Sequence, residues 1–389
     1  MKQLKSGFTT GTCAALAARA AVNMIFLQKS VDSETVITPK GTAITAEILN
    51  AKFGENYALC AVRKDAGDDS DVTNGILIYT KVTLRTDGKI TVDGGEGIGR
   101  VTKKGLKQNI GEAAINPVPR RMLAENVSEL LEKYGCESGA DILVYAPEGA
   151  EIAKKTFNPR LGIVGGISIL GTSGIVEPMS EQAIVDTIDA ELSVKRADGA
   201  EYIVLAPGNY GIDYIRENAG LDLEKAVKCS NFVGQSLDLC VKHGFKGVLL
   251  VGHIGKFVKL AGNIMNTHSK YADCRMEIIA ANTALFSDDI SLLRNILNCA
   301  TTDAALELLD AAGLLDKVMQ KITDKAAENI KNRVNGEIET GIIIFTTACG
   351  ERKWQSGYGN RGRFCVTDFG TGNTEPSETS EKVPNPQSF

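Results

Sequence analysis

The stretch GIVGGISILGTSGIVEPM, residues 162–179, contains the pattern of a strand, a glycine-rich loop and the start of a helix, and we take it as the centre of the fold. Residues 167–170 form a short apolar run bounded by glycines, which is typical of a strand buried on both faces. The small residues 171–174, GTSG, follow as a loop, and Pro178 and Ser180 indicate the start of a helix. This order is half of a βαβ unit, and ligands of open α/β sheets bind just beyond such strand ends.

The GTSG loop has two interpretations, and the pattern alone does not separate them. Its backbone N–H groups and two hydroxyls could bind a carboxylate, a phosphate or a ribose. Glycine is also needed in a tight turn with positive φ, which requires no ligand. Glu177, which follows the loop, could contact a ribose or accept a proton, or cap a helix. The candidate cofactor-binding residues of this stretch are Gly171, Thr172, Ser173, Gly174 and Glu177.

Length and charge narrow the class of protein. With 389 residues, the chain is long enough for two to three domains and a substantial core. A hydrophobic fraction of 43% and a charged fraction of 23% are those of a soluble globular protein. The net charge of −5 and the pI of about 5.5 argue against nucleic acid or an anionic membrane as the main partner.

The cysteines and the N-terminus indicate the compartment. Nine cysteines without any C-x-x-C favour free thiols in a reducing cytosol over a disulfide framework, and the usual zinc spacings are missing. No apolar run approaches the ~20 residues of a membrane helix. Arg19 and Asn23 interrupt the apolar segment 14–27, which favours an Ala-rich helix over a signal peptide. We therefore expect a cytoplasmic protein.

Residues 1–139 predict an α+β domain. The loop SGFTTGT leads into a helix that extends to residue 26, with Thr12 as its N-cap. Strand-like segments follow at 35–39, 43–51, 57–63, 75–85 and 89–92. TDGK at 86–89 predicts a hairpin turn that joins the last two strands.

Charged residues cluster in this first domain. The loop KDAGDDSDV at 64–72 lacks the spacing and the closing glutamate of a calcium loop, so a solvated acidic loop is favoured over a magnesium or substrate-facing one. Basic residues at 100–104 and 120–121 could bind carboxylates or phosphates, or lie in solvent. With one lysine from the second half of the chain, the candidate substrate-binding residues are Arg100, Lys103, Lys104, Arg120, Arg121 and Lys256.

Residues 140–348 predict a doubly wound α/β/α domain. Strands are expected at 141–146, 166–170, 202–206, 247–251, 277–281 and 341–346. Helices are expected at 181–196, 231–242, 256–264, 285–299, 303–312 and 314–333. Loops of small or polar residues, APEG, GTSG, APGNYG and GHIGK, follow four strands, so one rim of the sheet is predicted to carry a ligand site. The extension 349–389 is expected to be disordered beyond about residue 371.

Single motifs identify no chemistry. One G-x-G-x-x-G begins at Gly357, but no strand precedes it, and P-loop, G-x-S-x-G and H-E-x-x-H strings are absent. His253, in a strand-end loop, and His268, in NTHS, are candidate catalytic residues, as acid–base groups or substrate donors; a lone histidine is more often a satisfied polar group. Gly208 and Asn209 of APGNYG complete the candidate cofactor-binding set.

Several segments taken together are far more specific than any single motif. They are TTGTCAALAARAA (9–21), KDAGDDSDVT (64–73), GEGIGRVTKKGL (95–106), AAINPVPRRM (113–122), GGISILGTSGIVEPMS (165–180), LAPGNYG (205–211) and VGHIGKFVKLAGNIMNTHS (251–269). In this order, over residues 6–346, the chain resembles the cobalt-precorrin-5B (C1)-methyltransferase family of the anaerobic, cobalt-early cobalamin pathway. Residues 349–389 match nothing expected of that family.

The resemblance implies a reaction and its partners. It implies transfer of a methyl group from S-adenosylmethionine to C-1 of cobalt-precorrin-5B, which gives cobalt-precorrin-6A. Cobalt would enter as part of the tetrapyrrole substrate, so no protein metal site is implied. The resemblance also implies an α+β domain and an α/β domain, and it leaves room for a homo-oligomer and for transient contacts with other cobalamin-pathway enzymes.

Methyl transfer requires a positioned donor and acceptor but no covalent enzyme nucleophile, which agrees with the missing triad motifs. We expect S-adenosylmethionine against the GTSG and PGNYG loops, and the macrocycle between that rim and the basic loops of the first domain. Two alternatives remain at this stage. One is a nucleotide- or NAD-dependent enzyme on the same α/β domain, and the other is a non-catalytic carrier that binds the corrinoid but not S-adenosylmethionine.

Overall fold

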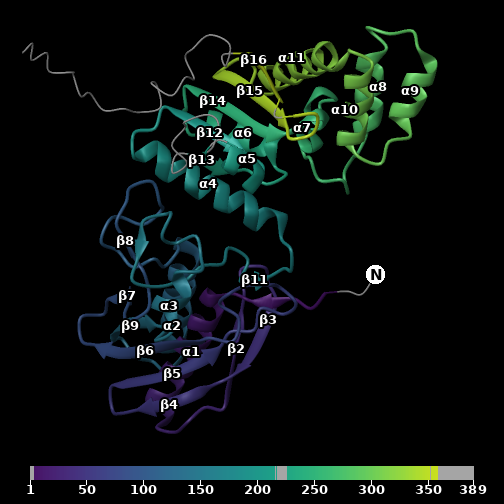
Figure 1. Ribbon diagram of the computed structural model, residues 1–389. Coiled ribbons are helices and arrows are strands. Elements are labelled where there is room, and N and C mark those ends of the chain that lie inside the picture. Colours follow the sequence, from purple (N-terminus) through teal and green to yellow (C-terminus); the bar gives the residue numbers. More distant parts are fainter. Residues whose placement is uncertain (1–3, 215, 217–225, 351, 358–389) are drawn as a thin grey trace, which may run out of the picture. The chain divides into compact units, whose positions relative to one another are not determined.

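The chain forms two compact units. A computed structural model describes residues 4–214, 216, 226–350 and 352–357, so the tail predicted to be disordered lies outside the described residues. Contacts divide the chain into Met1–Ala200, here the first unit, and Glu201–Phe389, here the second unit (Figure 1). The sequence instead predicts a boundary after residue 139.

The first unit is built on a mixed five-stranded sheet. In spatial order its strands are β4 (Leu49–Phe53), β5 (Tyr57–Arg63), β6 (Leu77–Arg85), β9 (Gly139–Tyr145) and β7 (Ile90–Gly94). Helices α1 (Thr10–Leu27) and α2 (Pro117–Lys133) pack against each other and against this sheet (Figure 1). Alternate residues of β6, Ile78, Thr80 and Val82, are buried, as expected for a strand with one face under helices. This is the predicted α+β architecture.

Helix α1 forms much of the core of the first unit. By length and composition it could cross a membrane, but 78% of it is buried inside the unit. Its small side chains allow the sheet to approach closely, and Thr80 Oγ1 donates a hydrogen bond to Ala14 O at 3.0 Å. The prediction of Thr12 as N-cap is wrong. Thr9 is the N-cap, because the chain is extended there and its Oγ1 accepts from the N–H of Thr12 at 3.3 Å.

Strand β9 lies between β6 and β7 and pairs with both. Its pairing with β6 is antiparallel and its pairing with β7 is parallel. The predicted hairpin at 86–89 is therefore wrong, and so is the placement of strand 141–146 in the second sheet. The reason is the crossover through α2, which returns the chain parallel to the strand that it left. The segment 43–51 also differs, because it divides at Ile48 into β3 (Ala43–Glu47), which pairs with β2 (Ser33–Ile37), and β4.

Residues 162–179 do not form half of a βαβ unit. Ile167 and Ile169 are buried, but they make isolated parallel bridges with Ile98 and Ile115 of the first unit. On either side, β10 (Ile163–Val164) pairs with β8 (Arg100–Val101), and β11 (Ile175–Val176) pairs with β1 (Gly7–Phe8). The short helix α3 (Gly149–Ala153) precedes this region. The predicted helix that follows is confirmed as α4 (Glu181–Ala197), with Ser180 as its N-cap.

The second unit has the predicted α/β architecture. Its sheet has the order β13 (Ala226–Lys228), β12 (Tyr202–Ala206), β14 (Gly247–His253), β15 (Glu339–Thr346) and β16 (Arg352–Gly357), of which the first four are parallel. Its helices are α5 (Asn209–Tyr214), α6 (Val233–Lys242), α7 (Ile254–Ala261), α8 (Arg275–Thr283), α9 (Ile290–Leu297), α10 (Thr302–Ala311) and α11 (Leu315–Arg333). Ile212 of α5 packs with Val251, whereas Phe257 of α7 lies against Gly252 on the opposite face, so helices cover both faces.

One predicted strand of the second unit is a helix. Residues 277–281 belong to α8, where Met276, Ile279, Ala280 and Thr283 are buried. Their spacing of three and four residues is the period of one helix face, which a short apolar run does not distinguish from a strand. Strand β16, in the part of the extension that is described, pairs antiparallel with β15 and was not predicted.

Candidate functional site

In the first unit, the GTSG loop packs against the N-terminus of α1. The N–H of Gly11 donates to Leu170 O at 3.1 Å, and the Oγ1 of Thr12 donates to Gly174 O at 2.7 Å. A Cβ on Gly171, whose φ is +130°, would lie 2.3 Å from Thr9 Oγ1. Glycine is therefore required here by packing and by backbone conformation.

Other groups of this loop are also used within the first unit. The hydroxyl of Ser173 donates to Ile175 O at 3.0 Å, and Glu177 forms an ion pair with Lys40. Thr172 is exposed, and no side-chain hydrogen bond joins it to another described residue. Of the two hydroxyls of the GTSG loop, that of Ser173 is used within the loop and that of Thr172 is exposed, so the packing favours the tight-turn interpretation over the ligand-binding one.

The acidic loop 64–72 binds protein groups. Asp65 pairs with Lys5 Nζ at 2.8 Å, Asp68 accepts from the N–H of Lys5 at 2.7 Å, and Asp69 accepts from the N–H of Met179 at 3.0 Å. Asp71 pairs at 2.6 Å with Lys64, whose side chain is only 2% exposed. Burial opposes ionisation of Asp71, but hydrogen bonds from Lys64 and Thr73 outweigh it and lower the pKa of its carboxyl. The loop joins the N-terminal segment to the residues after the GTSG loop.

Most of the predicted basic residues of the first unit already have partners. Arg100 binds both carboxylate oxygens of Asp93, at 2.8 and 3.0 Å, and Lys103 binds Asp198 at 3.0 Å. The guanidinium of Arg120 donates to Val92 O. Two cations remain for a ligand. Lys104 is exposed and has no hydrogen bond or ion pair with a described residue, and Arg121 makes a solvent-exposed contact of 3.7 Å with Glu125.

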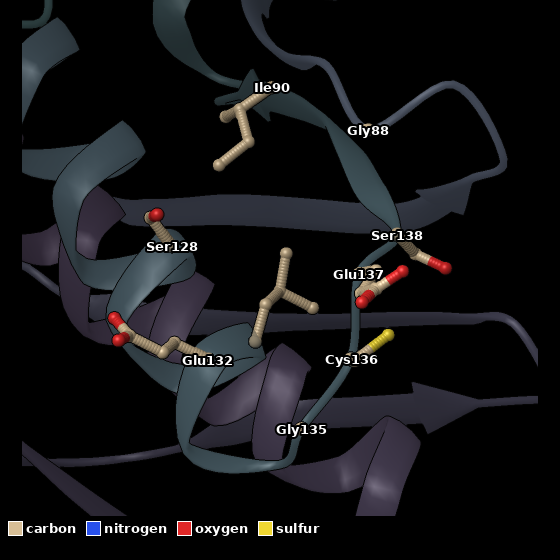
Figure 2. A pocket seen from close by; sticks show the side chains of 9 residues that line it. Gly88, Ile90, Ser128, Glu132, Gly135, Cys136, Glu137 and Ser138 are labelled. Atoms are coloured by element: carbon tan, nitrogen blue, oxygen red, sulfur yellow. The ribbon is translucent and has the colours of Figure 1, made fainter.

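The pocket in Figure 2 contains none of the predicted site residues. It lies at the C-terminal end of α2, has a volume of about 340 Å³ and is lined by Gly88, Ile90, Ser128, Leu131, Glu132, Gly135, Cys136, Glu137 and Ser138. The charged side chains in this lining are the carboxylates Glu132 and Glu137. An acidic hollow of this kind does not suit a ligand that carries carboxylates.

In the second unit, loops that follow parallel strands meet at one edge of the sheet. Gly208 and Asn209 follow β12, His253 is the last residue of the neighbouring strand β14, and Lys256 lies in the first turn of α7; we call these four residues the carboxyl-edge cluster. The turn after β12 lies over the end of β14, because a Cβ on Gly211 would be 2.9 Å from Val251 O. Such edges are the usual ligand sites of parallel α/β sheets.

The two loops of this edge differ in how closely they are packed. A Cβ on Gly208 would meet no atom of the described residues within 4 Å, so space beside it is not filled by them. Asn209 is exposed, and its Oδ1 accepts a hydrogen bond from Lys228 Nζ at 2.7 Å. The turn at Gly208 therefore leaves room beside its backbone, whereas neighbouring side chains occupy the space beside the glycines of the GTSG loop.

His253 is held as a neutral hydrogen-bond donor. It is the N-cap of α7, where its Nδ1 accepts from the N–H of Gly255 at 3.2 Å, so the proton lies on Nε2. Burial lowers the pKa of His253, against the opposing charge of Asp303. The ring also packs edge-on against Phe345, with centroids 5.6 Å apart. With Nδ1 engaged, this histidine suits donation to a ligand better than proton removal.

Asp303, in the first turn of α10, was missed by the sequence analysis. Its Oδ1 is buried, and among the described residues no donor forms a hydrogen bond with it. A carboxylate in the first turn of a helix is explained by the helix dipole, so its sequence position gave no signal.

Lys256 is the predicted basic residue whose surroundings best suit the binding of an anionic ligand. It is partly buried, and burial lowers the pKa of its ammonium. No hydrogen bond or ion pair joins it to any residue that the structure describes. A partly desolvated ammonium without an internal partner suits a carboxylate of a ligand.

His268 lies in a separate loop of the second unit. It is exposed, its Nδ1 accepts from the backbone N–H of Lys270 at 3.0 Å, and its own backbone N–H donates to Asn266 Oδ1 at 3.1 Å.

The predicted site residues are divided between the two units. Gly171–Gly174, Glu177 and five basic residues lie in the first unit, and the remaining predicted residues lie in the second unit. Across the described ranges, no group of three or more His, Cys, Asp or Glu side chains could hold a metal ion.

The fold is that of an α/β unit with polar loops at the carboxyl edge of its parallel strands, joined in one chain to an α+β unit. Residues 1–178 match the family model described as CbiD, and residues 266–356 match the model described as CbiD, C-terminal domain. The chain therefore belongs to the CbiD family. The second match ends at 356, inside the extension for which the sequence analysis found no likeness.

Named relatives cover nearly the whole chain. The cobalt-precorrin-5B C(1)-methyltransferase of Ruminiclostridium cellulolyticum is 47% identical over 345 residues, which are 89% of this chain and 90% of that protein. The enzyme of the same name from Listeria monocytogenes is 45% identical over 352 residues, 90% of this chain and 93% of the relative. A crystal structure of cobalamin biosynthesis protein (cbiD) from Archaeoglobus fulgidus is 28% identical, covers 67% of this chain and 80% of its own, and gives a TM-score of 0.37.

Proposed function

We propose that the protein transfers a methyl group from S-adenosylmethionine to C-1 of cobalt-precorrin-5B, giving cobalt-precorrin-6A in anaerobic cobalamin biosynthesis. The observation that carries this proposal is the similarity to methyltransferases of that name, at 44–47% identity over 89–90% of the chain. Cobalt enters with the tetrapyrrole, as part of the substrate. The free cysteines support a cytoplasmic location.

The carboxyl-edge cluster is the part of the chain that best fits the methyl donor. Bound S-adenosylmethionine supplies an electrophilic methyl group. Lys256 pairs with the donor's carboxylate, because its ammonium is partly buried and has no partner among the described residues. The open space beside Gly208 admits the donor, and Asn209 hydrogen-bonds the ribose. In the first unit, Thr172 keeps an exposed hydroxyl, and we assign the glycines of the GTSG loop to packing.

The corrinoid's carboxylates are bound by exposed cations of the first unit. Lys104 and Arg121 fill this role, since Arg100, Lys103 and Arg120 are held by other groups of the chain. His253 donates its Nε2–H to a ligand oxygen or nitrogen. His268, with Nδ1 engaged and its ring exposed, presents Nε2 to the substrate. These residues bind and orient, and positioning supplies much of the rate of such a transfer.

The test is an anaerobic reaction of the purified protein with methyl-labelled S-adenosylmethionine and cobalt-precorrin-5B. We expect a corrinoid heavier by one labelled methyl group in mass spectrometry, with the new methyl at C-1 in the NMR spectrum. A corrinoid that co-elutes with the protein unchanged would instead support the carrier function. A folded protein that neither binds nor methylates the corrinoid would contradict the proposal.

A further inference from the structure

Lys259 of α7 is buried, although nothing in the proposed reaction uses it. Its side chain is 2% exposed, and Lys64 is the other lysine buried to this degree in the described residues. Its ammonium is hydrogen-bonded to protein groups and is not available to a ligand. A buried ammonium is stable only when protein groups replace its water.

The partners of Lys259 lie at the two ends of one loop. Its Nζ donates to Thr267 O at 3.1 Å and to Ala272 O at 2.8 Å, and it lies 3.6 Å from Asp273 Oδ1. A single buried side chain thus joins the start of the loop 267–272 to its end. We call this segment the His268 loop.

Hydrogen bonds tie both ends of the His268 loop to other residues of the second unit. At the start, the N–H of Thr267 donates to Asn231 O at 3.0 Å. At the end, Asp273 accepts two hydrogen bonds from Arg275, at 2.5 and 2.9 Å. Between these points His268, Ser269, Lys270 and Tyr271 are exposed, and Tyr271 is 53% exposed. The loop therefore has few apolar contacts that could hold it.

We propose that Lys259 is a positioning residue, whose ammonium closes the His268 loop from beneath and fixes the place from which His268 presents Nε2. The inference rests on the proposed function, since it takes His268 to contact the substrate. Three donors on one flexible stem suit this task, because they satisfy two carbonyls and approach a carboxylate together. Without them, Thr267 O and Ala272 O would lose donors in a buried place, and the loop would open to water.

The first test reads the loop without any methyl transfer. Lys270 provides a tryptic site inside the His268 loop, so cleavage after Lys270 reports loop opening under native conditions. We expect Lys259→Met to raise this cleavage rate about tenfold, and we expect an intermediate rate for Lys259→Gln, which keeps an uncharged amide donor group. Lys246→Met is the matched control, because Lys246 is an exposed lysine of the same unit that pairs with Glu201 at 2.6 Å. Equal cleavage rates in folded wild-type, Lys259→Gln and Lys259→Met proteins would overturn the proposal.

The second test links the loop to turnover. We expect Lys259→Met to lower kcat ten- to a hundredfold with little change in the KM for S-adenosylmethionine, since small displacements of a positioned group cost about this much. In a His268→Ala background, the same change should add almost nothing. An equal loss in both backgrounds would show that Lys259 acts elsewhere. If wild-type protein shows no methyl transfer, the proposed function fails, while the proteolysis result still decides whether Lys259 holds the loop.

Discussion

The two units use their glycine-rich loops in opposite ways. In the first unit the GTSG loop is filled, since Gly171 and Gly174 lie against Thr9 and Thr38, and its carbonyls accept hydrogen bonds from the start of α1. In the second unit the turn at Gly208 faces open space, and Lys256 has no partner within the described residues. Two loops with similar sequences thus differ in whether the protein itself already supplies hydrogen-bond partners for their polar groups. Unsatisfied groups at the edge of a parallel sheet are the better indication of a ligand.

The largest expected effect comes from adding one methyl group to each loop. Gly171→Ala combines a φ of +130° with a contact of 2.3 Å, so we expect a loss of about 3 kcal/mol in the free energy of unfolding. Gly208→Ala enters open space, and we expect a change within about 0.5 kcal/mol. Urea unfolding followed by circular dichroism gives both values. A stable Gly171→Ala protein with weakened binding of S-adenosylmethionine would reverse the comparison.

The next effect tests the unpaired ammonium. Lys256→Met removes the cation but keeps the stem, and we expect the Kd for S-adenosylmethionine, measured by calorimetry, to rise about thirtyfold, or roughly 2 kcal/mol. Lys246→Met, which removes an exposed lysine from the same unit, should leave the Kd unchanged. An unaltered Kd in Lys256→Met would remove the carboxyl-edge cluster as the donor site.

A smaller effect, on the KM for the corrinoid, should distinguish an exposed arginine of the first unit from one that is already paired. Arg121 is exposed beside Glu125 at 3.7 Å, whereas Arg100 donates two hydrogen bonds to the carboxylate of Asp93. We expect Arg121→Ala to raise the KM for the corrinoid about fivefold, close to the 1 kcal/mol of an exposed ion pair. Arg100→Ala should change the KM less than it changes the unfolding midpoint. If Arg100→Ala has the larger effect on KM, the corrinoid displaces Asp93 from its partner.

Much of this fold follows from sequence periodicity, while strand partners do not. Strands 57–63 and 202–206 and helix 181–196 lie where their patterns predict them. The hairpin at 86–89 failed because a crossover through α2 places β9 between its strands, which no local signal reveals. The strand predicted at 277–281 is wrong because the short run of four apolar or small residues after Glu277 fits the period of a helix as well as that of a strand.

The site was predictable in part. The position of His253 and Lys256 after a buried strand pointed correctly to the carboxyl edge of the sheet. The GTSG loop gave the same local pattern, and only its three-dimensional packing against Thr9 shows that the glycines are structural. Asp303 lies in the first turn of α10, where a carboxylate is explained by the helix dipole, so the sequence gave no sign that its Oδ1 is buried. Whether Arg100 is free or paired depends on Asp93, which composition and spacing could not show.

The smallest expected effect is the loss of folding stability at low pH, and this loss should also differ between the two units. Burial lowers the pKa of His253 below its ordinary 6.5, so the unfolded chain takes up this proton more readily. The stabilisation is full above pH 6.5 and is lost as the pH falls through the folded pKa. In the first unit, the pKa of Asp71 is lowered in the folded state, so the stabilisation that this carboxylate contributes is lost only at pH values below its ordinary pKa of 3.8. The second unit should therefore weaken first on acidification.

Trp354, the single tryptophan of the sequence, lies in the second unit and is 5% exposed, so its fluorescence follows that unit. Between pH 7 and 5, we expect the urea midpoint seen by this fluorescence to fall in the wild type and to fall less in His253→Asn, which keeps an N-cap side chain without the titration. His268→Gln, at an exposed histidine, is the control and should behave as the wild type. Equal slopes for wild type and His253→Asn would show that the imidazole gains no proton on unfolding. In that case the neutral, Nε2-protonated donor proposed for His253 would be wrong.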